Sequence, residues 1–271
     1  MDLATIGGVI FAIAVVATGA ALEHVALKSL LGISAFLIVI GGSIGATIIS
    51  HTKDDLKRVP QGLKLAFMPP KLDYLGTIEY LISLAEKARR SGLLALQTDA
   101  EVAPTPLLRQ GLTMIADGAD LDTVQDTLEW MADMEAEETN RAAAVFESCG
   151  GYSPTLGIMG TVMALITIMG NLTEPDALAA AIAVAFLATL YGIGFANLLF
   201  LPMGSKIKRA TAEQRKLNDM VIAGLLGIAA GENPRMLRDK LLIHAGPQSG
   251  GRRERAAEAV PGEASAAREG I

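Results

Sequence analysis

The sequence lacks ionisable residues in all of its long apolar runs. Four such runs have no Asp, Glu, Lys, Arg or His in their interior: Leu3 to Leu22, Ser29 to Ser50, Ser153 to Leu172 and Ala177 to Leu201. Ionisable groups inside a membrane are costly and usually mark the path of an ion or proton. If this protein moves ions, a second chain must therefore bring the titrating charge.

Cysteine and clustered histidine are also scarce. Cys149 is the single cysteine, which excludes an intrachain disulfide, and we interpret it as a small apolar residue. The three histidines (His24, His51, His244) are scattered, and no His/Asp/Glu cluster, Gly-rich phosphate loop or Ser/His pairing lies near the apolar runs. The net charge is −6, and there is no basic face with interleaved aromatic residues. These absences argue against an enzyme, a cofactor, a metal site and a nucleic-acid partner.

Each apolar run is close to the roughly 20 residues that a helix needs to cross a hydrocarbon core. The first run is not a signal peptide, because it lacks a basic start and a clean cleavage site and a second run follows at once. The alternative is that the runs are buried helices of a large soluble protein. We predict an all-α polytopic membrane protein with four transmembrane helices and a helical cytoplasmic domain.

The distribution of positive charge predicts the orientation. Lys and Arg residues follow the second and fourth runs, whereas the connector from Asn171 to Asp176 contains acids and neither Lys nor Arg. Basic loops tend to remain in the cytoplasm. Both termini and the long middle segment are therefore predicted to face the cytoplasm, with the Glu23-His24 turn outside.

Hydropathy and turn signals also divide the chain. Helical patterns are predicted at 59–67, 72–90, 106–117 and from 121 onward, and the last has no strong breaker before Gly150 and is expected to continue toward the membrane. The predicted parts are a transmembrane hairpin (1–50), a cytoplasmic helical domain (51–150), two further transmembrane helices (151–202), a cytoplasmic helical extension (203–245) and a disordered tail (246–271).

Small and hydroxylated residues stand out in the two later runs. Small residues such as Gly157 and Gly160 line the helix faces and predict close helix neighbours. A threonine in a membrane helix commonly bonds a carbonyl of its own helix, and alternatively solvates a passing ion or bonds a partner's carboxylate. The threonines open to these two interpretations are Thr155, Thr161, Thr167 and Thr189.

Two prolines fall at notable places. Ser153 can cap a helix and Pro154 fits a first helical turn, so we expect the third membrane helix to begin there, with a functional role of Pro154 as the alternative. Pro202 falls where the fourth run continues into a further helix. There it removes one backbone hydrogen bond and bends the helix, as a hinge or as a fixed kink.

Four segments together carry a resemblance to a known family. They are residues 88–96 (ARRSGLLAL), 152–162 (YSPTLGIMGTV), 188–192 (ATLYG) and 199–202 (LFLP). In sequence and in the order of spans, the chain up to about His244 resembles the flagellar motor stator A subunit, the MotA/PomA family. Each segment alone is weak, and the combination is specific.

The resemblance implies a bacterial inner-membrane protein that forms a homopentameric ring around a dimer of single-span MotB/PomB-like subunits. Each partner helix carries the Asp that binds the ion, which explains the missing acid in this chain. By the same resemblance, Thr161 and Thr189 face that carboxylate, with Thr155 also on the ion pathway. Pro154 and Pro202 couple ion passage to movement.

The resemblance also implies a contact with the rotor protein FliG. Arg89, Arg90 and Gln97 lie in the corresponding region. Many family members carry Glu where this chain has Gln97, which weakens the assignment, although Asp99 and Glu101 follow closely and a neighbouring acid can take over such a role.

The transported ion and the user of the torque are left open by the sequence. Thr161 together with Thr189 resembles the sodium-driven branch, which favours Na⁺ over H⁺. An ExbB/TolQ-like energiser is the nearest alternative, but such proteins have one span before the cytoplasmic segment and this chain has two. A non-flagellar stator relative is a second alternative. A transporter working alone needs an intramembrane binding group or broken helices in repeated halves, and neither is seen.

Overall fold

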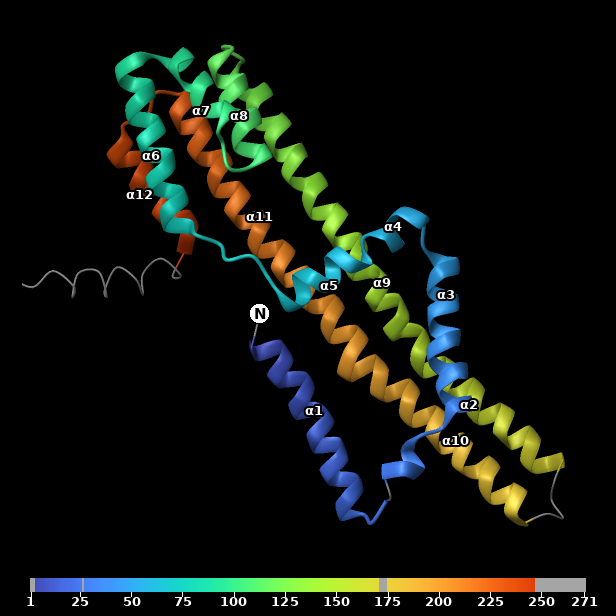
Figure 1. Cartoon of the computed structure of the whole chain (residues 1–271). Helices are drawn as coiled ribbons and strands as arrows, with labels where there is room; N and C mark the ends of the chain where they lie inside the picture. Colours follow the sequence, from blue (N-terminus) through green and yellow to red (C-terminus); the bar gives the residue numbers. More distant parts are fainter. Residues whose placement is uncertain (1–2, 26, 171–174, 247–271) are drawn as a thin grey trace, which may run out of the picture. The chain divides into compact units, whose positions relative to one another are not determined.

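The computed structural model describes residues 3–25, 27–170 and 175–246 (Figure 1). The regular elements within these ranges are helices, which confirms the predicted all-α class. They form two compact units. The first, here called the apolar unit, comprises Met1–Pro70 and Ala136–Ala212, and the second, the polar unit, comprises Lys71–Glu135 and Glu213–Ile271.

These units are defined by packing, and the division predicted from hydropathy at residues 50, 150, 202 and 245 stays a prediction. Residues 171–174 of the acidic connector and residues 247–271 of the predicted tail lie outside the described residues.

Within the described ranges, four helices are long and apolar enough to cross a membrane, as the sequence predicts. The first is α1 (Leu3–Leu22), and the third lies in α9 (Leu121–Gly170). The second and fourth are composite. After a short turn η1 (Leu27–Leu30), the second consists of α2 (Ile33–Phe36), the π-turn η2 (Leu37–Gly41) and α3 (Gly42–Ser50). The fourth runs from α10 (Pro175–Phe195) through the π-turn η4 (Ala196–Phe200) into α11 (Leu201–Ala229).

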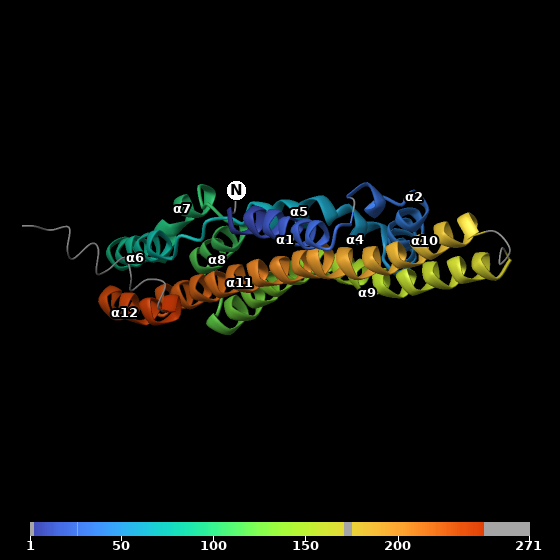
Figure 2. The ribbon, with the colours of Figure 1, turned by 90° about the horizontal axis from the view of Figure 1, so that it is seen from below.

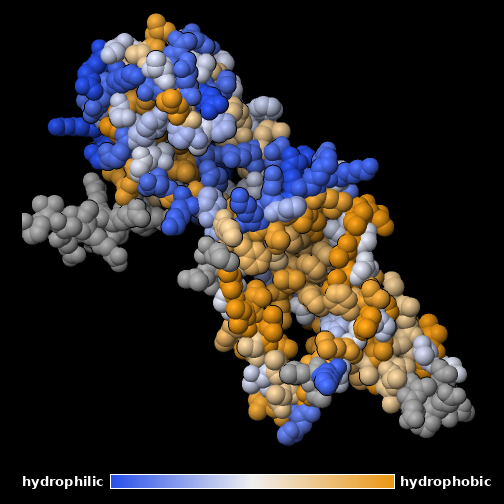
Figure 3. Space-filling view, viewed as in Figure 1, coloured by the Kyte–Doolittle hydropathy of each residue, from blue (hydrophilic) through white to orange (hydrophobic). Residues whose placement is uncertain are grey.

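The surface of the apolar unit is widely hydrophobic, as the orange face in Figure 3 shows. Large apolar side chains on every span are exposed, including Phe11, Ile49, Ile166 and Phe186. Soluble monomers rarely expose apolar patches of this extent. The helices therefore require lipid or other protein chains around them.

The expectation that a helix begins at Ser153-Pro154 is wrong, because α9 is continuous from Leu121 to Gly170 with Pro154 inside it. Ser153 is fully buried and its hydroxyl donates to the carbonyl oxygen of Cys149, at 2.9 Å, so it does not act as a cap. A proline inside a membrane helix is tolerated where neighbouring helices and hydroxyl groups bond the local backbone. The predicted continuation of the helix from 121 toward the membrane is confirmed, and the helix also passes Gly150 without a break.

Pro202 is the second residue of α11, two positions after the end of the π-turn η4. A π-turn widens the helix locally, and such turns often accompany bends and functional sites. The backbone thus departs from regular α geometry where the sequence places the bend. The two alternatives for Pro202, a hinge and a fixed kink, stay predictions.

The polar unit surrounds its own hydrophobic core. Its helices are α6 (Tyr74–Ser91), η3 (Leu93–Leu96), α7 (Gln97–Glu101), α8 (Pro106–Ala116), α12 (Pro234–Ala245) and the polar ends of α9 and α11. The core includes Ile78, Leu81, Leu112, Leu128, Leu225 and Leu237, all nearly inaccessible. Ile78, Leu81, Ile82 and Ala85 of the predicted 72–90 helix face this core, which confirms its amphipathic pattern.

Polar caps fix where the helices of this unit begin. Asp73 accepts a hydrogen bond from the amide of Gly76, and Thr105 accepts one from that of Leu108. At the start of α9, the Asp120 carboxylate accepts from the Thr123 amide at 2.9 Å and from its hydroxyl at 2.7 Å. These bonds stabilise the ionised form and lower the pKa of Asp120 below its usual value.

Candidate functional site

Helices α9 and α10 approach each other at backbone contact, and both ribbon views show them side by side (Figures 1 and 2). A Cβ atom added to Gly157 would lie 2.8 Å from the carbonyl oxygen of Ala188. One added to Gly192 would lie 2.7 Å from the carbonyl oxygen of Ser153. Only glycine fits at either position, because neither backbone oxygen can rotate away. The predicted close packing through small residues is confirmed here.

Next to this contact, Thr161 of α9 and Thr189 of α10 meet, with their hydroxyl oxygens 2.8 Å apart. Thr161 also lies within hydrogen-bond distance of the carbonyl oxygens of Gly157, at 3.0 Å, and Ala185, at 3.3 Å. Thr189 reaches the same Ala185 oxygen at 3.4 Å. Both side chains are half-buried.

This arrangement offers more hydrogen-bond acceptors than hydroxyl protons. The two threonine hydroxyls carry two protons and four oxygen lone pairs. Each proton can be donated to a backbone carbonyl oxygen or to the other hydroxyl. The pair can therefore redirect its lone pairs toward a cation, or a proton toward a carboxylate, by rotating the hydroxyl hydrogens. It cannot itself supply a titrating charge.

Thr155 is not part of this pair. Its hydroxyl is exposed and donates to the carbonyl oxygen of Tyr152 in its own helix, at 2.8 Å. Thr161 is six positions further along the helix, which corresponds to about 9 Å along the helix axis. Thr167 likewise bonds the carbonyl oxygen of Met163 and is exposed. Of the threonines singled out by the sequence, the structure brings together Thr161 and Thr189.

Several charged residues of the apolar unit form ion pairs outside the uncharged runs. Lys208 binds Glu147 at 2.7 Å, and Arg58 binds Glu138 at 2.7 Å. Within the described part of the chain, no group of three His, Cys, Asp or Glu side chains is arranged to hold a metal ion. The four apolar runs contain no Asp or Glu, so these runs supply no carboxylate to the threonine pair.

Two further contacts escaped the sequence interpretation. Ser43 of α3 and Ser153 of α9 are fully buried with their hydroxyl oxygens 3.0 Å apart. Tyr191 of α10 donates to the carbonyl oxygen of Leu30 and accepts from the amide of Gly32 at 3.0 Å, which ties the second span to the fourth. The only signal in the sequence was a polar atom in an apolar run, because such atoms need a partner when buried.

Two family models match the chain. The first, described as the MotA/TolQ/ExbB proton channel family, matches residues 82–220. The second, described as Motility protein A N-terminal, matches residues 6–92. The chain belongs to the MotA/TolQ/ExbB proton channel family. Together the two matches cover the four spans and the intervening polar helices.

Individual members of this family are similar over nearly the whole length. Motility protein A of Bacillus subtilis (strain 168) is 34% identical over 248 residues, 90% of this chain and 91% of that protein. The solved structure of C. jejuni MotAB has a TM-score of 0.85 at 32% identity and covers 90% of this chain and 96% of that one. The flagellar MotAB stator complex from Bacillus subtilis has a TM-score of 0.84 at 31% identity, covering 94% and 98%.

The residues that the family resemblance assigns to the rotor lie in the polar unit. Arg89 and Arg90 are exposed in the last turn of α6 and line an open hollow of about 490 Å³ together with Glu86 and Pro234. Basic residues at a helix C-terminus also favour the helix dipole, which is an ordinary structural role. Gln97 is exposed at the start of α7.

Neighbouring acids differ in how far they can stand in for the Glu that many relatives carry in place of Gln97. Asp99 binds Lys87 at 2.6 Å and is partly buried, so its charge is already engaged within the polar unit. Glu101 is exposed at the end of α7. Of these two acids, Glu101 is the better placed to meet an external partner.

Proposed function

We propose that this chain is the ion-conducting A subunit of a flagellar motor stator, without enzymatic activity of its own. The observation that supports this most strongly is the family match at residues 6–92, where two spans precede the polar helices. An ExbB/TolQ-like energiser is the alternative, and the two-span hairpin makes it the weaker one.

The lack of charge in the spans supports a complex with a second chain. The two solved structures described above are of C. jejuni MotAB and of the flagellar MotAB stator complex from Bacillus subtilis. In the proposed assembly, five copies of this chain form a ring in the bacterial inner membrane around two single-span MotB/PomB-like helices. Each partner helix brings one Asp. The basic segments after the second and fourth spans support the proposed cytoplasmic position of both termini.

In the proposed mechanism, an ion moves down its gradient onto the partner's Asp and neutralises a charge that is costly in low dielectric. This changes the position that the partner helix prefers within the ring. One elementary charge crossing 100 mV supplies about 2.3 kcal/mol, while a net hydrogen bond contributes about 1 kcal/mol. The energy supplied by a single ion is thus enough to break one or two helix contacts and form others, which moves the ring by one step.

Thr161 and Thr189 are the residues proposed to face that Asp. Their spare lone pairs can complete the shell of a partly dehydrated cation, and a rotated hydroxyl can donate to the empty carboxylate. Dehydrated Na⁺ benefits from oxygen ligands more than a proton does, because a proton binds the carboxylate covalently. The pair therefore favours Na⁺ over H⁺, and Thr155 has at most an accessory position on the pathway.

Pro154 and Pro202 are proposed to couple ion passage to movement. Pro154 lies between the Ser43–Ser153 contact and the Gly157–Gly192 contact, where its missing N–H weakens α9. Pro202 follows the π-turn of the fourth span. Movement at these points reaches the polar helices, where Arg89, Arg90 and Gln97 are proposed to contact FliG.

Reconstitution tests this function. Proteoliposomes with this chain alone should pass no cation current under an imposed potential. Co-reconstitution with a single-span partner that carries the Asp should produce a current, and replacing that Asp by Asn should abolish it. A current from this chain alone, or none with the partner, contradicts the proposal.

A further inference from the structure

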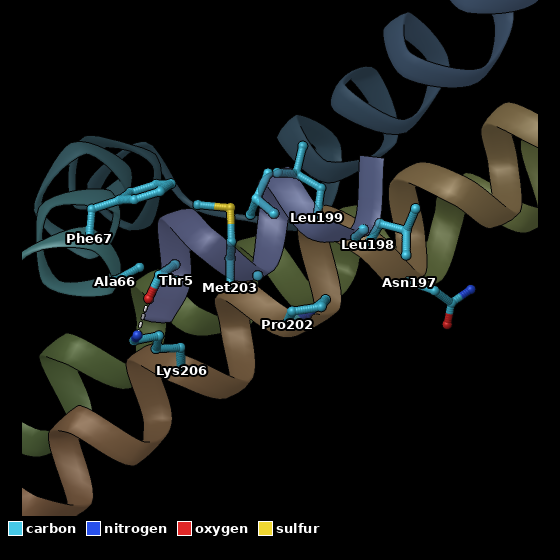
Figure 4. Close-up of a pocket in the computed structure, with 12 residues that line it drawn as sticks. Thr5, Ala66, Phe67, Asn197, Leu198, Leu199, Pro202, Met203 and Lys206 are labelled. Atoms are coloured by element: carbon cyan, nitrogen blue, oxygen red, sulfur yellow. Dashed lines mark hydrogen bonds between the residues drawn. The ribbon is translucent and has the colours of Figure 1, made fainter. Parts of the chain in front are cut away.

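Exposed apolar side chains have different explanations in the two units. In the apolar unit they lie on helices long and apolar enough to cross a membrane, where lipid covers them. A cavity of about 370 Å³ between α1, α5 (Val59–Phe67) and the start of α11 belongs to the same region (Figure 4). The surface of the polar unit is mostly hydrophilic (Figure 3), so large apolar side chains exposed there point to contacts with other protein surfaces.

One such surface runs along α9 within the polar unit. Asp126, Trp130 and Met134 follow one another at intervals of four residues and are all exposed, Trp130 to 65%. Residues four positions apart lie on the same side of a helix. Leu128, which belongs to the buried core, lies on the opposite side of α9 from Trp130. We call this stripe the α9 face; it carries a negative charge at its first position and apolar surface at the next two.

A second such surface runs along α12. Arg235, Asp239 and Ile243 are also spaced by four residues and exposed, and Met236 lies beside them. Ile243 is 80% exposed and Met236 72%. Leu237 is fully buried on the other side of the helix. We call this stripe the α12 face; it has a positive charge at its first position, a carboxylate in the middle and an apolar side chain at its end.

The two faces match position by position when the two helices lie parallel. The pairs are then, in order, Asp126 with Arg235, Trp130 with Asp239, and Met134 with Ile243. The indole N–H of Trp130 needs an acceptor when it is buried, and the Asp239 carboxylate offers one. Within the described ranges, neither Asp126 nor Arg235 takes part in an ion pair. Their opposite charges are therefore available to each other.

The path of the chain gives the two helices the same direction. In the polar unit α9 and α11 run antiparallel, because Asp133 pairs with Arg215 while Leu128 and Leu225 lie close to the same point of α8. The connector 230–233 then reverses the chain into α12, which therefore runs in the direction of α9 (Figure 1). Rotation about the axis of a ring does not change the direction of a helix along that axis. The α9 of one copy and the α12 of the next thus stay parallel.

The two faces lie on opposite sides of α11. Leu225 is on the side of α9, whereas Gly227 is on the side of α12, since a Cβ added to Gly227 would lie 2.5 Å from Leu237. Residues two positions apart in a helix point about 200° apart. Figure 1 shows the same order, with α11 between α12 and α9. Faces on opposite sides of one unit cannot reach each other, but they meet between neighbouring copies in a head-to-tail ring.

We propose that the α9 face of each copy of this chain binds the α12 face of the next copy. This contact rests on the proposed function, which supplies the ring, and it joins the copies outside the membrane spans. A second copy is the occupant because the matching face belongs to the same chain and has the same spacing and direction. Pairing the α9 face with itself about a two-fold axis would instead bring Asp126 against Met134, so that a charge would face an apolar side chain.

Charge reversal tests the pair at the first position. Asp126→Arg alone and Arg235→Asp alone should each weaken the association of copies about fivefold per contact. The double variant should restore it, because every contact then holds the same pair with the charges exchanged. Arg109→Asp, at an exposed residue of α8 on neither face, is the matched control. Native mass spectrometry of the full assembly in mild detergent measures the fraction of complete rings. Losses that add up in the double variant overturn the proposal.

Disulfide cross-linking of the full chain in membranes, with its partner subunit present, tests the register. In a Cys149→Ala background, Asp126→Cys with Arg235→Cys, and Met134→Cys with Ile243→Cys, should give a ladder of linked copies under mild oxidation. Asp126→Cys with Ile243→Cys is the matched control. These two positions are about 12 Å out of register along the helix, whereas a disulfide joins Cα atoms less than about 7 Å apart, so the control should stay unlinked.

The outcomes separate this contact from the proposed function. Linked dimers of single-cysteine variants would mean that a face meets its own copy, and this result, linking in the control pair alone, or no linking in either matched pair overturns the proposal. Partner-dependent cation current is measured on the same variants after reconstitution. Missing links with intact current count against this contact alone, whereas links without current count against the proposed function alone.

Discussion

Ser43 and Ser153 join α3 to α9 through buried hydroxyl groups 3.0 Å apart. Ser153 directly precedes Pro154. Each hydroxyl also reaches a carbonyl oxygen of its own helix, that of Val39 for Ser43 and that of Cys149 for Ser153. A hydroxyl has a single proton, so only one of the two can donate across the interface at a time. The contact holds the second span against the turn of α9 in which Pro154 lacks a backbone N–H.

Removing this contact should lower the free energy of unfolding only slightly, but the two serines should show a measurable interaction energy in a double-mutant cycle. Ser43→Ala and Ser153→Ala each leave the other hydroxyl bonded to its own helix, so the double variant should be less destabilised than the sum, by about 0.6 kcal/mol. Reversible unfolding in mixed micelles measures this cycle. Thr155→Ala, which removes an exposed hydroxyl of α9 that donates to the carbonyl oxygen of Tyr152 in the same helix, is the control. Strict additivity of the serine variants contradicts the assigned contact.

Alanine at the glycines of the α9–α10 contact should be strongly destabilising. Gly157→Ala and Gly192→Ala force a methyl group against backbone atoms, and overpacking of this kind costs about 1–3 kcal/mol. Gly151→Ala on α9 and Gly194→Ala on α10 place the same methyl group in open space and are matched controls. Thermal stability of the purified assembly distinguishes them, and equal losses in both sets are incompatible with the packing described.

The threonine pair should determine the response to sodium. Thr161→Ala and Thr189→Ala each remove one oxygen ligand, and a lost hydrogen bond or ligand to a charged group corresponds to roughly a tenfold weaker apparent affinity for Na⁺. Thr155→Ala, whose hydroxyl bonds only its own helix, should have a much smaller effect. The measurement is partner-dependent flux, or swimming speed, against sodium concentration. An unchanged sodium dependence in Thr161→Ala removes the preference for Na⁺ over H⁺.

Rotor contact should be separable from ion flow. Arg89→Ala and Arg90→Ala should lower swimming speed in a complemented stator-deficient strain while leaving partner-dependent flux in proteoliposomes unchanged, since both side chains are exposed in the polar unit. Lys240→Ala, an exposed lysine of α12 paired with Glu232, is the control for loss of a surface cation. If the arginine variants swim like the control, FliG binds elsewhere.

The start of α9 should lose stability in acid. Hydrogen bonds from Thr123 lower the pKa of Asp120, so the ionised cap contributes fully above the ordinary carboxylate pKa of about 3.9, and the contribution is lost as pH falls through the lowered value. Amide hydrogen exchange in the first turn of α9, corrected for the intrinsic rate, should rise over that range. Asp120→Asn keeps an acceptor without a titrating charge and should abolish the pH dependence. The same acid response in Asp120→Asn assigns the effect to another group.

Several features of the fold follow directly from the order of residues. Uninterrupted apolar runs of membrane length predict the four spans, because the hydrophobic effect and backbone hydrogen bonding leave a helix as the only solution for such a run in lipid. The 3.6-residue spacing of apolar side chains predicts the core-facing side of α6. The absence of a carboxylate from the four spans can also be predicted from the sequence, since it depends on composition alone.

Contacts between distant residues were decided by tertiary structure. Pro154 looked like a helix start because capping rules consider only a few neighbours, whereas the buried Ser43, 110 positions away, bonds Ser153 within a continuous helix. Thr161 and Thr189 were linked beforehand only through the family resemblance. Their 2.8 Å contact depends on glycines that let two backbones touch. Local patterns determine which segments become helices, but the side chains that meet are determined by how those helices pack.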